Sequence, residues 1–309
     1  MGAASAKQLF FLSHAVLAPW LATACSCDTN CTRVDDNSHG VWCLRECGFA
    51  VLRGVYDKAA LDELNAAVEN NRDELQKAWS VAGPVRGEHL WLGFPNRHPF
   101  NRSEWLYNPR LSQFVEEYSG GKVTLDLVSF FLNPASGSTY QAWHMDSMQL
   151  PFALKVQIPL IDISSMHGPT EFSVLKYDVM SAARVAKRYM REVWDGRRTA
   201  LEEDEPFREY LKQEGLLLEC TVKGTYERGS VMAYINSLPH RGTPNRSPHN
   251  RVIMDHAYGT TNKRANEATK FPSRFQRNME LYSRLYEQYR DEDHNAAEAT
   301  AKVLHDNEL

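Results

Sequence analysis

Short runs of apolar and β-branched residues, separated by glycine and proline turns, predict a β-rich domain over most of this chain. The longest run covers residues 123–132, where apolar residues alternate with other residues as they do along a half-buried strand. Further strands are expected at 139–145 and at 152–163. Shorter strands are predicted at residues 48–54, 216–222, 230–235 and 252–258. The expected fold class is therefore mainly β with some α-helix.

Helical periodicity appears on both sides of these strands and once between them. Apolar residues recur at helical spacing over residues 58–80, and Asp57 is placed to cap the first turn. Residues 178–215 interrupt the β pattern with an amphipathic helix and a second helix, so we expect a helical insertion there. Residues 261–309 are rich in charged residues and predict a C-terminal helical tail. The β-rich domain is accordingly bounded at residues 48–260.

Residues 1–24 have the pattern of a secretory signal peptide. Lys7 precedes an apolar run over residues 9–21, and a small-x-small cleavage sequence follows at 22–24. The run is too short and too interrupted to predict a stable membrane span. An unprocessed N-terminal extension is the competing interpretation.

The cysteines are concentrated just after this segment. Five of the six lie within residues 25–47, and the sixth is Cys220. An even number of cysteines after a signal peptide predicts disulfides, and therefore the secretory pathway, either outside the cell or in the lumen of the endoplasmic reticulum. A zinc cluster is the weaker alternative, because the Cys-x-Cys and Cys-x₃-Cys spacings differ from the paired Cys-x₂-Cys spacing of zinc sites.

Composition narrows the class of protein further. Hydrophobic residues make up 43% of the 309 positions, which is enough for a sizeable core. The net charge of -4 provides no basic field, so nucleic acid is not expected as a partner. The aromatic residues suit a β-rich fold with an aromatic-lined cavity, or equally a filled core.

The chemistry of the chain centres on His144 and Asp146, in the sequence Gln-Ala-Trp-His-Met-Asp. Residues two apart on a strand project from the same face, so an imidazole and a carboxylate there can meet one metal ion. His240 is the best candidate for a third ligand. Two histidines and one carboxylate are the ligands of non-haem Fe(II) oxygenases, which keep coordination positions open. We therefore predict that these three residues are the metal ligands and the catalytic centre.

Three motifs resemble the phytanoyl-CoA dioxygenase family of Fe(II)/2-oxoglutarate-dependent oxygenases. They are Gln-x-Trp-His-x-Asp at 141–146, Gly-Pro-Thr-Glu-Phe at 168–172, and His-Arg-Gly-x-Pro-Asn-x-Ser with a following Arg at 240–251. The motifs occur in the family's order and spacing over roughly residues 45–260. The resemblance implies a double-stranded β-helix core, jelly-roll or cupin-like, flanked by helices. The chain departs from the family at residues 173–177, which replace its usual Pro-Gly-Ser/Thr-His turn.

The resemblance also implies a cosubstrate and a reaction. Arg251 lies eleven residues after His240 and is expected to pair the C5 carboxylate of 2-oxoglutarate, because a guanidinium binds a carboxylate through two parallel hydrogen bonds. Gln157 is expected near the same cosubstrate. The implied reaction uses O₂ and yields succinate and CO₂ while a C–H bond of a small-molecule or lipid-like substrate is hydroxylated or otherwise oxidised. The alternative function is a catalytically inactive binding protein of the same fold in the secretory pathway.

Overall fold

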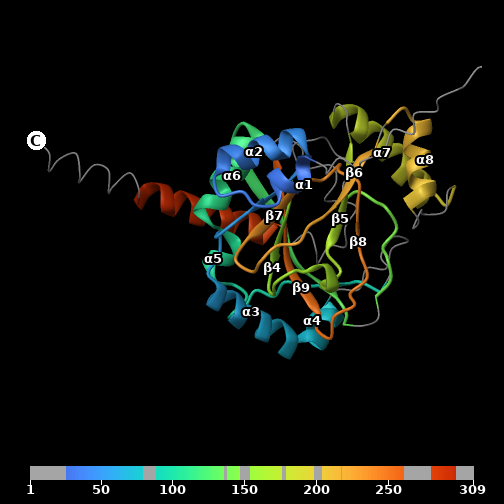
Figure 1. Ribbon diagram of the computed structural model, residues 1–309. Helices are drawn as coiled ribbons and strands as arrows, with labels where there is room; N and C mark the ends of the chain where they lie inside the picture. The colour runs from blue at the N-terminus through green and yellow to red at the C-terminus, as the bar shows by residue number, and fades with distance from the viewer. Residues whose placement is uncertain are drawn as a thin grey trace, which may run out of the picture.

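The computed structural model describes residues 26–78, 88–135, 138–146, 154–175, 179–197, 204–216, 218–260 and 280–296. Two antiparallel sheets lie at its centre (Figure 1). The larger sheet has the strand order β1 (Phe49–Leu52), β7 (Val231–Ile235), β4 (Leu154–Pro159), β9 (Arg251–Thr260), β3 (Val123–Asn133) and β2 (Leu90–Leu92). The smaller sheet has the order β6 (Leu218–Lys223), β5 (Thr170–Leu175) and β8 (His240–Gly242).

Aromatic rings join the inner faces of the two sheets. Phe172 on β5 stacks on Phe49 of β1 with 5.2 Å between ring centroids, and it contacts Tyr234 of β7 at 5.2 Å. Two facing sheets of this kind form the predicted double-stranded β-helix, a mainly β core with flanking helices. The six-stranded sheet does not close on itself.

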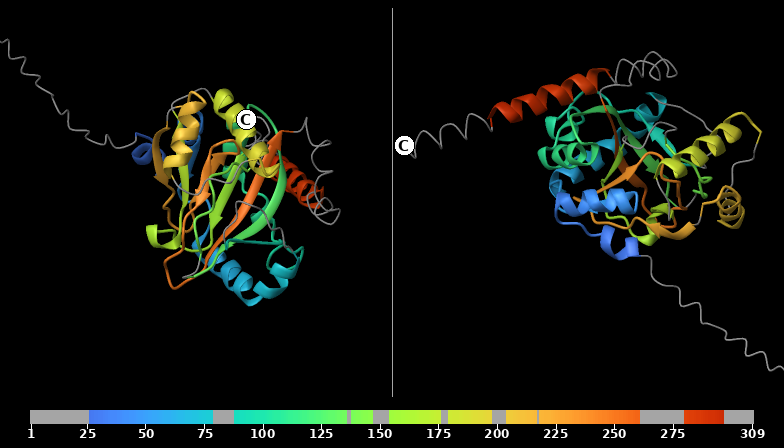
Figure 2. Two further views of the ribbon diagram at one scale, coloured as in Figure 1. Left: turned by 90° about the vertical axis from the view of Figure 1, so that its right-hand side faces the viewer. Right: turned by 90° about the horizontal axis from the view of Figure 1, so that it is seen from above.

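The outer face of the larger sheet is apolar and covered. Phe130 and Ile158 both pair with Met254 across β9, and all three side chains are fully buried. Tyr286, in a helix over residues 280–296, packs its ring on Tyr258 of β9 at 5.8 Å. The other helices around this sheet are α1 (Ser26–Cys31), α2 (Asn37–Glu46), α3 (Lys58–Asn70), α4 (Arg72–Ala78), α5 (Ser103–Leu106) and α6 (Pro109–Ser119) (Figure 2).

The inner face of the same sheet carries several buried polar side chains beside its apolar ones. Lys155 pairs with Tyr234 on one side and with Ala257 on the other, and Gln157 pairs with Asp255 two residues further along β4. Residues that pair directly in a sheet lie on the same face, so these polar side chains all point between the two sheets. Because burying polar groups is costly, their presence there indicates a binding site and not a purely hydrophobic core.

Helices α7 (Val179–Trp194) and α8 (Asp204–Gln213) lie beside the smaller sheet (Figure 1). Phe207 of α8 stacks on Trp143, with 4.7 Å between centroids and 6° between ring planes, and its edge contacts Tyr189 of α7. Trp143 is 1% exposed and precedes His144 in the chain. The two helices therefore pack behind the segment that carries His144.

Disulfides hold the short helix α1 against α2. They join Cys27 to Cys47 and Cys31 to Cys43, and Cys220 on β6 is also disulfide-bonded. No cysteine in the described part of the chain is free. The prediction of disulfides is confirmed, and these sulfurs are not available to a zinc ion. The expected signal peptide at 1–24 lies outside the described residues.

Two local predictions are wrong. The single helix expected over residues 58–80 is divided into α3 and α4 at Asn71, whose side chain caps the end of α3 by donating to the carbonyl of Ala67 at 2.7 Å. The segment 139–145 is not a strand. The Ala142 carbonyl lies 2.9 Å from the ring of His144, so it bonds to that side chain instead of extending a ladder.

Candidate metal centre

Three side chains from distant parts of the sequence converge between the sheets. His144 and Asp146 come from the segment beside β8, and His240 begins β8. One possible ligand atom from each lies within 4.8 Å of the others, and Nε2 of His240 is 3.5 Å from Oδ2 of Asp146. Small side-chain shifts would let one ion with bonds of about 2 Å reach all three atoms.

The backbone explains why the two histidines meet. The N–H of His144 donates to the carbonyl of His240 at 3.0 Å, and the N–H of His240 donates back at 2.9 Å. The pair forms an isolated antiparallel bridge, and the ring centroids are 4.5 Å apart. One bridge is therefore enough to bring ligands almost 100 residues apart in the sequence to one point.

Both imidazoles are held in the tautomer that a metal ligand needs. Nδ1 of His144 lies 2.9 Å from the carbonyl of Ala142, and Nδ1 of His240 lies 2.8 Å from the carbonyl of Leu238. A carbonyl only accepts, so each Nδ1 must carry the proton and donate. Each Nε2 then keeps its lone pair for a metal ion, and the hydrogen bond to Nδ1 fixes the ring orientation.

Asp146 is kept ionised by its surroundings. Desolvation opposes ionisation, but the positive charge of Lys155 outweighs it and holds the pKa of the carboxyl well below its ordinary value. The hydroxyl of Tyr234 donates to Oδ2 of Asp146 at 2.7 Å and fixes the carboxylate from the larger sheet. Burial, followed by the neighbouring negative charge of Asp146, raises the pKa of this tyrosine well above its ordinary value, so it remains a donor.

Arg251, the predicted cosubstrate residue, is 1% exposed at the start of β9. One terminal nitrogen donates to the carbonyl of Gly168, while Nε has no hydrogen-bond partner among the described residues. Gly168 has φ +66, and a side chain there would meet the Thr243 carbonyl at 2.4 Å, so glycine is required for this close approach. Burial lowers the pKa of Arg251 to about 10, which leaves the guanidinium charged at neutral pH.

Gln157, the other predicted cosubstrate residue, lies on the inner face. Its side-chain oxygen accepts from Thr170 at 3.0 Å, and its nitrogen is 3.4 Å from the hydroxyl of Tyr234. Beside it, Lys155 and Asp255 form a buried ion pair. This pair and Tyr234 were not anticipated from the sequence, because each contact joins strands that are distant along the chain.

The remaining histidines have different environments. His89 is 3% exposed, and burial together with the charge of Arg251 lowers its pKa to about 3. His256 lies on the outer face of β9, 3.2 Å from the hydroxyl of Tyr258, and His249 is exposed. His249 and His256 are therefore not placed to orient the metal ligands.

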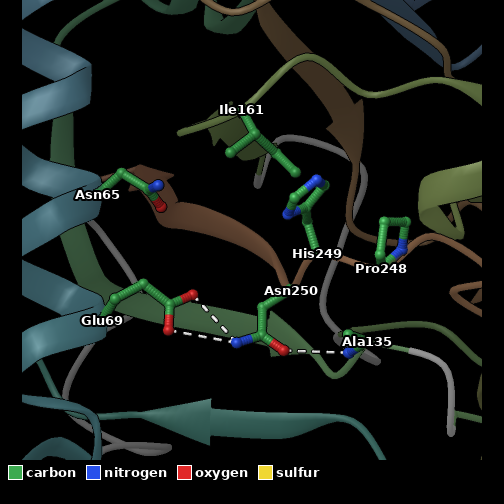
Figure 3. Close-up of a pocket in the computed structure, with 7 residues that line it drawn as sticks. All are labelled: Asn65, Glu69, Ala135, Ile161, Pro248, His249 and Asn250. Atoms are coloured by element: carbon green, nitrogen blue, oxygen red, sulfur yellow. Dashed lines mark hydrogen bonds between the residues drawn. The ribbon is translucent and has the colours of Figure 1, made fainter.

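A separate pocket of about 370 Å³ lies near the start of β9 (Figure 3). Asn250 crosses it, accepting from the backbone of Ala135 at 3.0 Å and donating to Glu69 of α3 at 3.1 Å. None of its seven lining residues belongs to the candidate metal centre.

The donor set fits a non-haem iron site with a 2-oxoglutarate cosubstrate. Two neutral imidazoles and one carboxylate form the facial ligand group of these oxygenases. The buried guanidinium of Arg251 has no carboxylate partner among the described residues, and a buried charge of this kind requires an anion. The position and charge of Arg251 therefore fit a carboxylate ligand such as that of 2-oxoglutarate.

Solved structures with similar folds include proteins described as alpha ketoglutarate dependent or as holding iron or 2-oxoglutarate. The non-heme alpha ketoglutarate dependent carbocyclase SnoK from nogalamycin biosynthesis is 17% identical, with a TM-score of 0.53, and the match covers 75% of this chain and 90% of that one. EctD from S. alaskensis with bound Fe is 17% identical, with a TM-score of 0.52, covering 74% and 79%. EctD with 2-oxoglutarate and 5-hydroxyectoine is 15% identical, with a TM-score of 0.51, covering 74% and 79%. No curated protein sequence matches the chain.

The fold and the donor set together define a non-haem iron, 2-oxoglutarate-dependent oxygenase. The family model for phytanoyl-CoA dioxygenase matches residues 44–253. The chain belongs to the phytanoyl-CoA dioxygenase family, as its sequence motifs predicted.

Proposed function

We propose that this protein binds Fe(II) through His144, Asp146 and His240, and binds 2-oxoglutarate through Arg251. It would then use O₂ to oxidise a C–H bond of a small-molecule or lipid-like substrate, with succinate and CO₂ as co-products. The proposal is supported by one combination of groups. Two imidazoles of fixed orientation and an ionised carboxylate converge, and the same domain contains a buried guanidinium with no acidic partner in the described part of the chain.

Each residue has a distinct task in this scheme. His144 and His240 present Nε2 to the metal because their Nδ1 protons are held by backbone carbonyls. Asp146 supplies the anionic ligand, and Tyr234 keeps it pointed at the centre. When bound, the iron supplies the capacity to activate O₂ at the expense of 2-oxoglutarate. The carboxylate ligand leaves no position for a halide, which favours hydroxylation or a related oxidation.

Arg251 and Gln157 would orient the cosubstrate. The unpaired Nε of Arg251 can donate to a carboxylate that its terminal nitrogen also reaches. Gln157 is held by Thr170 on β5 and lies beside Tyr234, which supports a role for its amide in orienting the cosubstrate. Both side chains are buried, so they would exclude water from the bound cosubstrate.

The proposed setting is the secretory pathway. Its support is the disulfides of the segment 25–47, which form and persist in oxidising compartments. None of the helices in the described ranges has the length and hydropathy of a membrane span. We propose a signal peptide at 1–24, an oxygenase domain at 48–260 with the helical insertion at 178–215, and a C-terminal tail at 261–309.

Succinate formation tests the proposal. Protein loaded anaerobically with Fe(II) would be mixed with O₂, 2-oxoglutarate and a panel of metabolites, and succinate would be measured. Wild type should form succinate faster with at least one metabolite, and His240→Ala should form none above background. A wild type that binds 2-oxoglutarate but never forms succinate would support the inactive binding protein instead.

A further inference from the structure

A buried ion pair that has no part in the proposed iron and cosubstrate contacts lies on the inner face of the larger sheet. Lys155 on β4 and Asp255 on β9 contact each other, and their side chains are 9% and 7% exposed. They stand 100 residues apart in the sequence on directly neighbouring strands.

The pair is poorly suited to a purely structural role. Oδ1 of Asp255 is buried and accepts no hydrogen bond from any residue within the described ranges. Burying two charges is costly, and the cost is recovered only when the remaining lone pairs are also satisfied. A second buried ion pair, Arg241 with Glu171, is more complete, because two guanidinium nitrogens contact one carboxylate oxygen at 2.8 Å and 2.7 Å.

The position of the pair places it next to the metal ligands. Lys155 pairs across the sheet with Tyr234, whose hydroxyl bonds to Asp146. On the other side, Asp255 pairs with Ser129 of β3, which accepts a hydrogen bond from the indole of Trp91 at 2.5 Å. The ring of Trp91 lies 5.8 Å from Nζ of Lys155 and is only partly buried. An apolar ring and an unsatisfied acceptor thus lie side by side near the metal centre.

The pair is also unsuited to the cosubstrate. A carboxylate approaching Lys155 would meet the negative charge of Asp255, whereas Arg251 carries no such partner among the described residues. Oδ1 of Asp255 can only accept a hydrogen bond when it is ionised. Its complement is therefore a donor group on a molecule other than 2-oxoglutarate.

We propose that Asp255, positioned by Lys155 and walled by Trp91, is a specificity-determining residue that accepts a hydrogen bond from a hydroxyl or ammonium group of the substrate. The inference rests on the proposed function and narrows its substrate class to small molecules that carry such a donor close to the oxidised carbon. Unfunctionalised hydrocarbon chains are disfavoured, because they would leave the acceptor desolvated and unpaired.

The test uses the full chain loaded with Fe(II) and 2-oxoglutarate without O₂. The probes are matched n-butyl and cyclohexyl compounds that carry an ammonium, a hydroxyl, a carboxylate or a methyl group, with binding measured by ligand-observed NMR. Wild type should bind the hydroxyl or ammonium probe about tenfold to a hundredfold more tightly than the methyl probe, as expected for a hydrogen bond to a charged acceptor. Comparing the two donor probes separates an alcohol site from an amine site.

Two variants complete the design. Lys155→Met with Asp255→Leu removes the pair and should abolish the donor preference. Asp255→Asn keeps the shape and should reduce the preference, which guards against misfolding of the double variant. The proposal is overturned if no donor-bearing probe binds wild type, or if the preference survives in both variants. If the proposed function itself is wrong, the result differs: the wild-type protein then binds neither Fe(II) nor 2-oxoglutarate.

Discussion

Replacing Arg251 with methionine separates a ligand-binding role from a structural role. Methionine keeps much of the side-chain volume and removes the charge. The guanidinium is 1% exposed, and its Nε has no partner among the described residues. If it pairs the cosubstrate carboxylate, its loss leaves that carboxylate buried and unpaired, which costs about 3–5 kcal/mol. The affinity for 2-oxoglutarate should therefore fall by roughly two to four decades.

The free energy of unfolding without ligand should respond differently. Arg251→Met loses one hydrogen bond to Gly168 but also removes an unpaired buried charge, so stability should change by less than about 2 kcal/mol. Arg241→Met is the matched control, because that arginine is 4% exposed and bonded to Glu171 between the rings of Tyr140 and Trp143. Breaking this pair should lower stability by about 3–5 kcal/mol.

The assay is anaerobic titration of 2-oxoglutarate, with iron content determined in parallel and urea unfolding of the ligand-free proteins. Arg251→Lys keeps the charge without the planar fork and should fall between wild type and Arg251→Met in affinity. Iron binding should be almost unchanged in both variants. An Arg251→Met protein that binds 2-oxoglutarate within about threefold of wild type would refute the assignment.

Three further predictions follow from named contacts. Tyr234→Phe removes the hydrogen bond to Asp146 and should weaken Fe(II) affinity about 10- to 100-fold, measured by competition with a chelator; unchanged affinity would show that the contact is unimportant. Because burial lowers the pKa of His256 to about 3, the unfolded state binds its proton first as pH falls below about 6.5. The free energy of unfolding should therefore decrease as the pH is lowered, and His256→Asn should make this decrease shallower by about 1.4 kcal/mol per pH unit between pH 6 and 4. If urea unfolding gives wild type and variant the same slope of stability against pH, the prediction is contradicted. Changing Cys27 and Cys47 to serine opens a loop with a sequence separation of 20 and should lower the free energy of unfolding in urea by about 3 kcal/mol. A decrease below about 1 kcal/mol would show that this disulfide contributes little to stability.

The candidate metal-binding residues could be identified from the sequence because the spacing of His144 and Asp146 indicates the direction of their side chains. His144 and Asp146 are two residues apart, and an extended chain projects both from one face even though the segment is not a regular strand. His240 was found through the motif that follows it. The alternation of side chains along a strand also argues against a role for His256 at the metal site. His256 lies five residues after Arg251 on a regular strand, so the two side chains point to opposite faces of the sheet.

The supporting residues were not accessible in this way. Tyr234 sits in an apolar run that predicts only a strand, and its hydroxyl meets Asp146 only because folding brings β7 beside the segment that carries Asp146. The same is true of Lys155 and Asp255, whose contact depends on β4 and β9 being neighbours. The order of the strands in a sheet depends on the packing of the whole chain, so a local pattern of residues does not predict it. The fold class followed from the strand pattern and the family motifs, whereas these contacts required the sheet itself.

The central claim is that His144, Asp146 and His240 bind one iron ion. The most direct test is anaerobic equilibration with Fe(II), followed by measurement of the iron retained per chain in wild type, His144→Ala and His240→Ala. We expect about one equivalent in wild type and a loss of at least tenfold in affinity for each variant, since each removes one of three ligands. Retention of iron by both variants with wild-type affinity would contradict it.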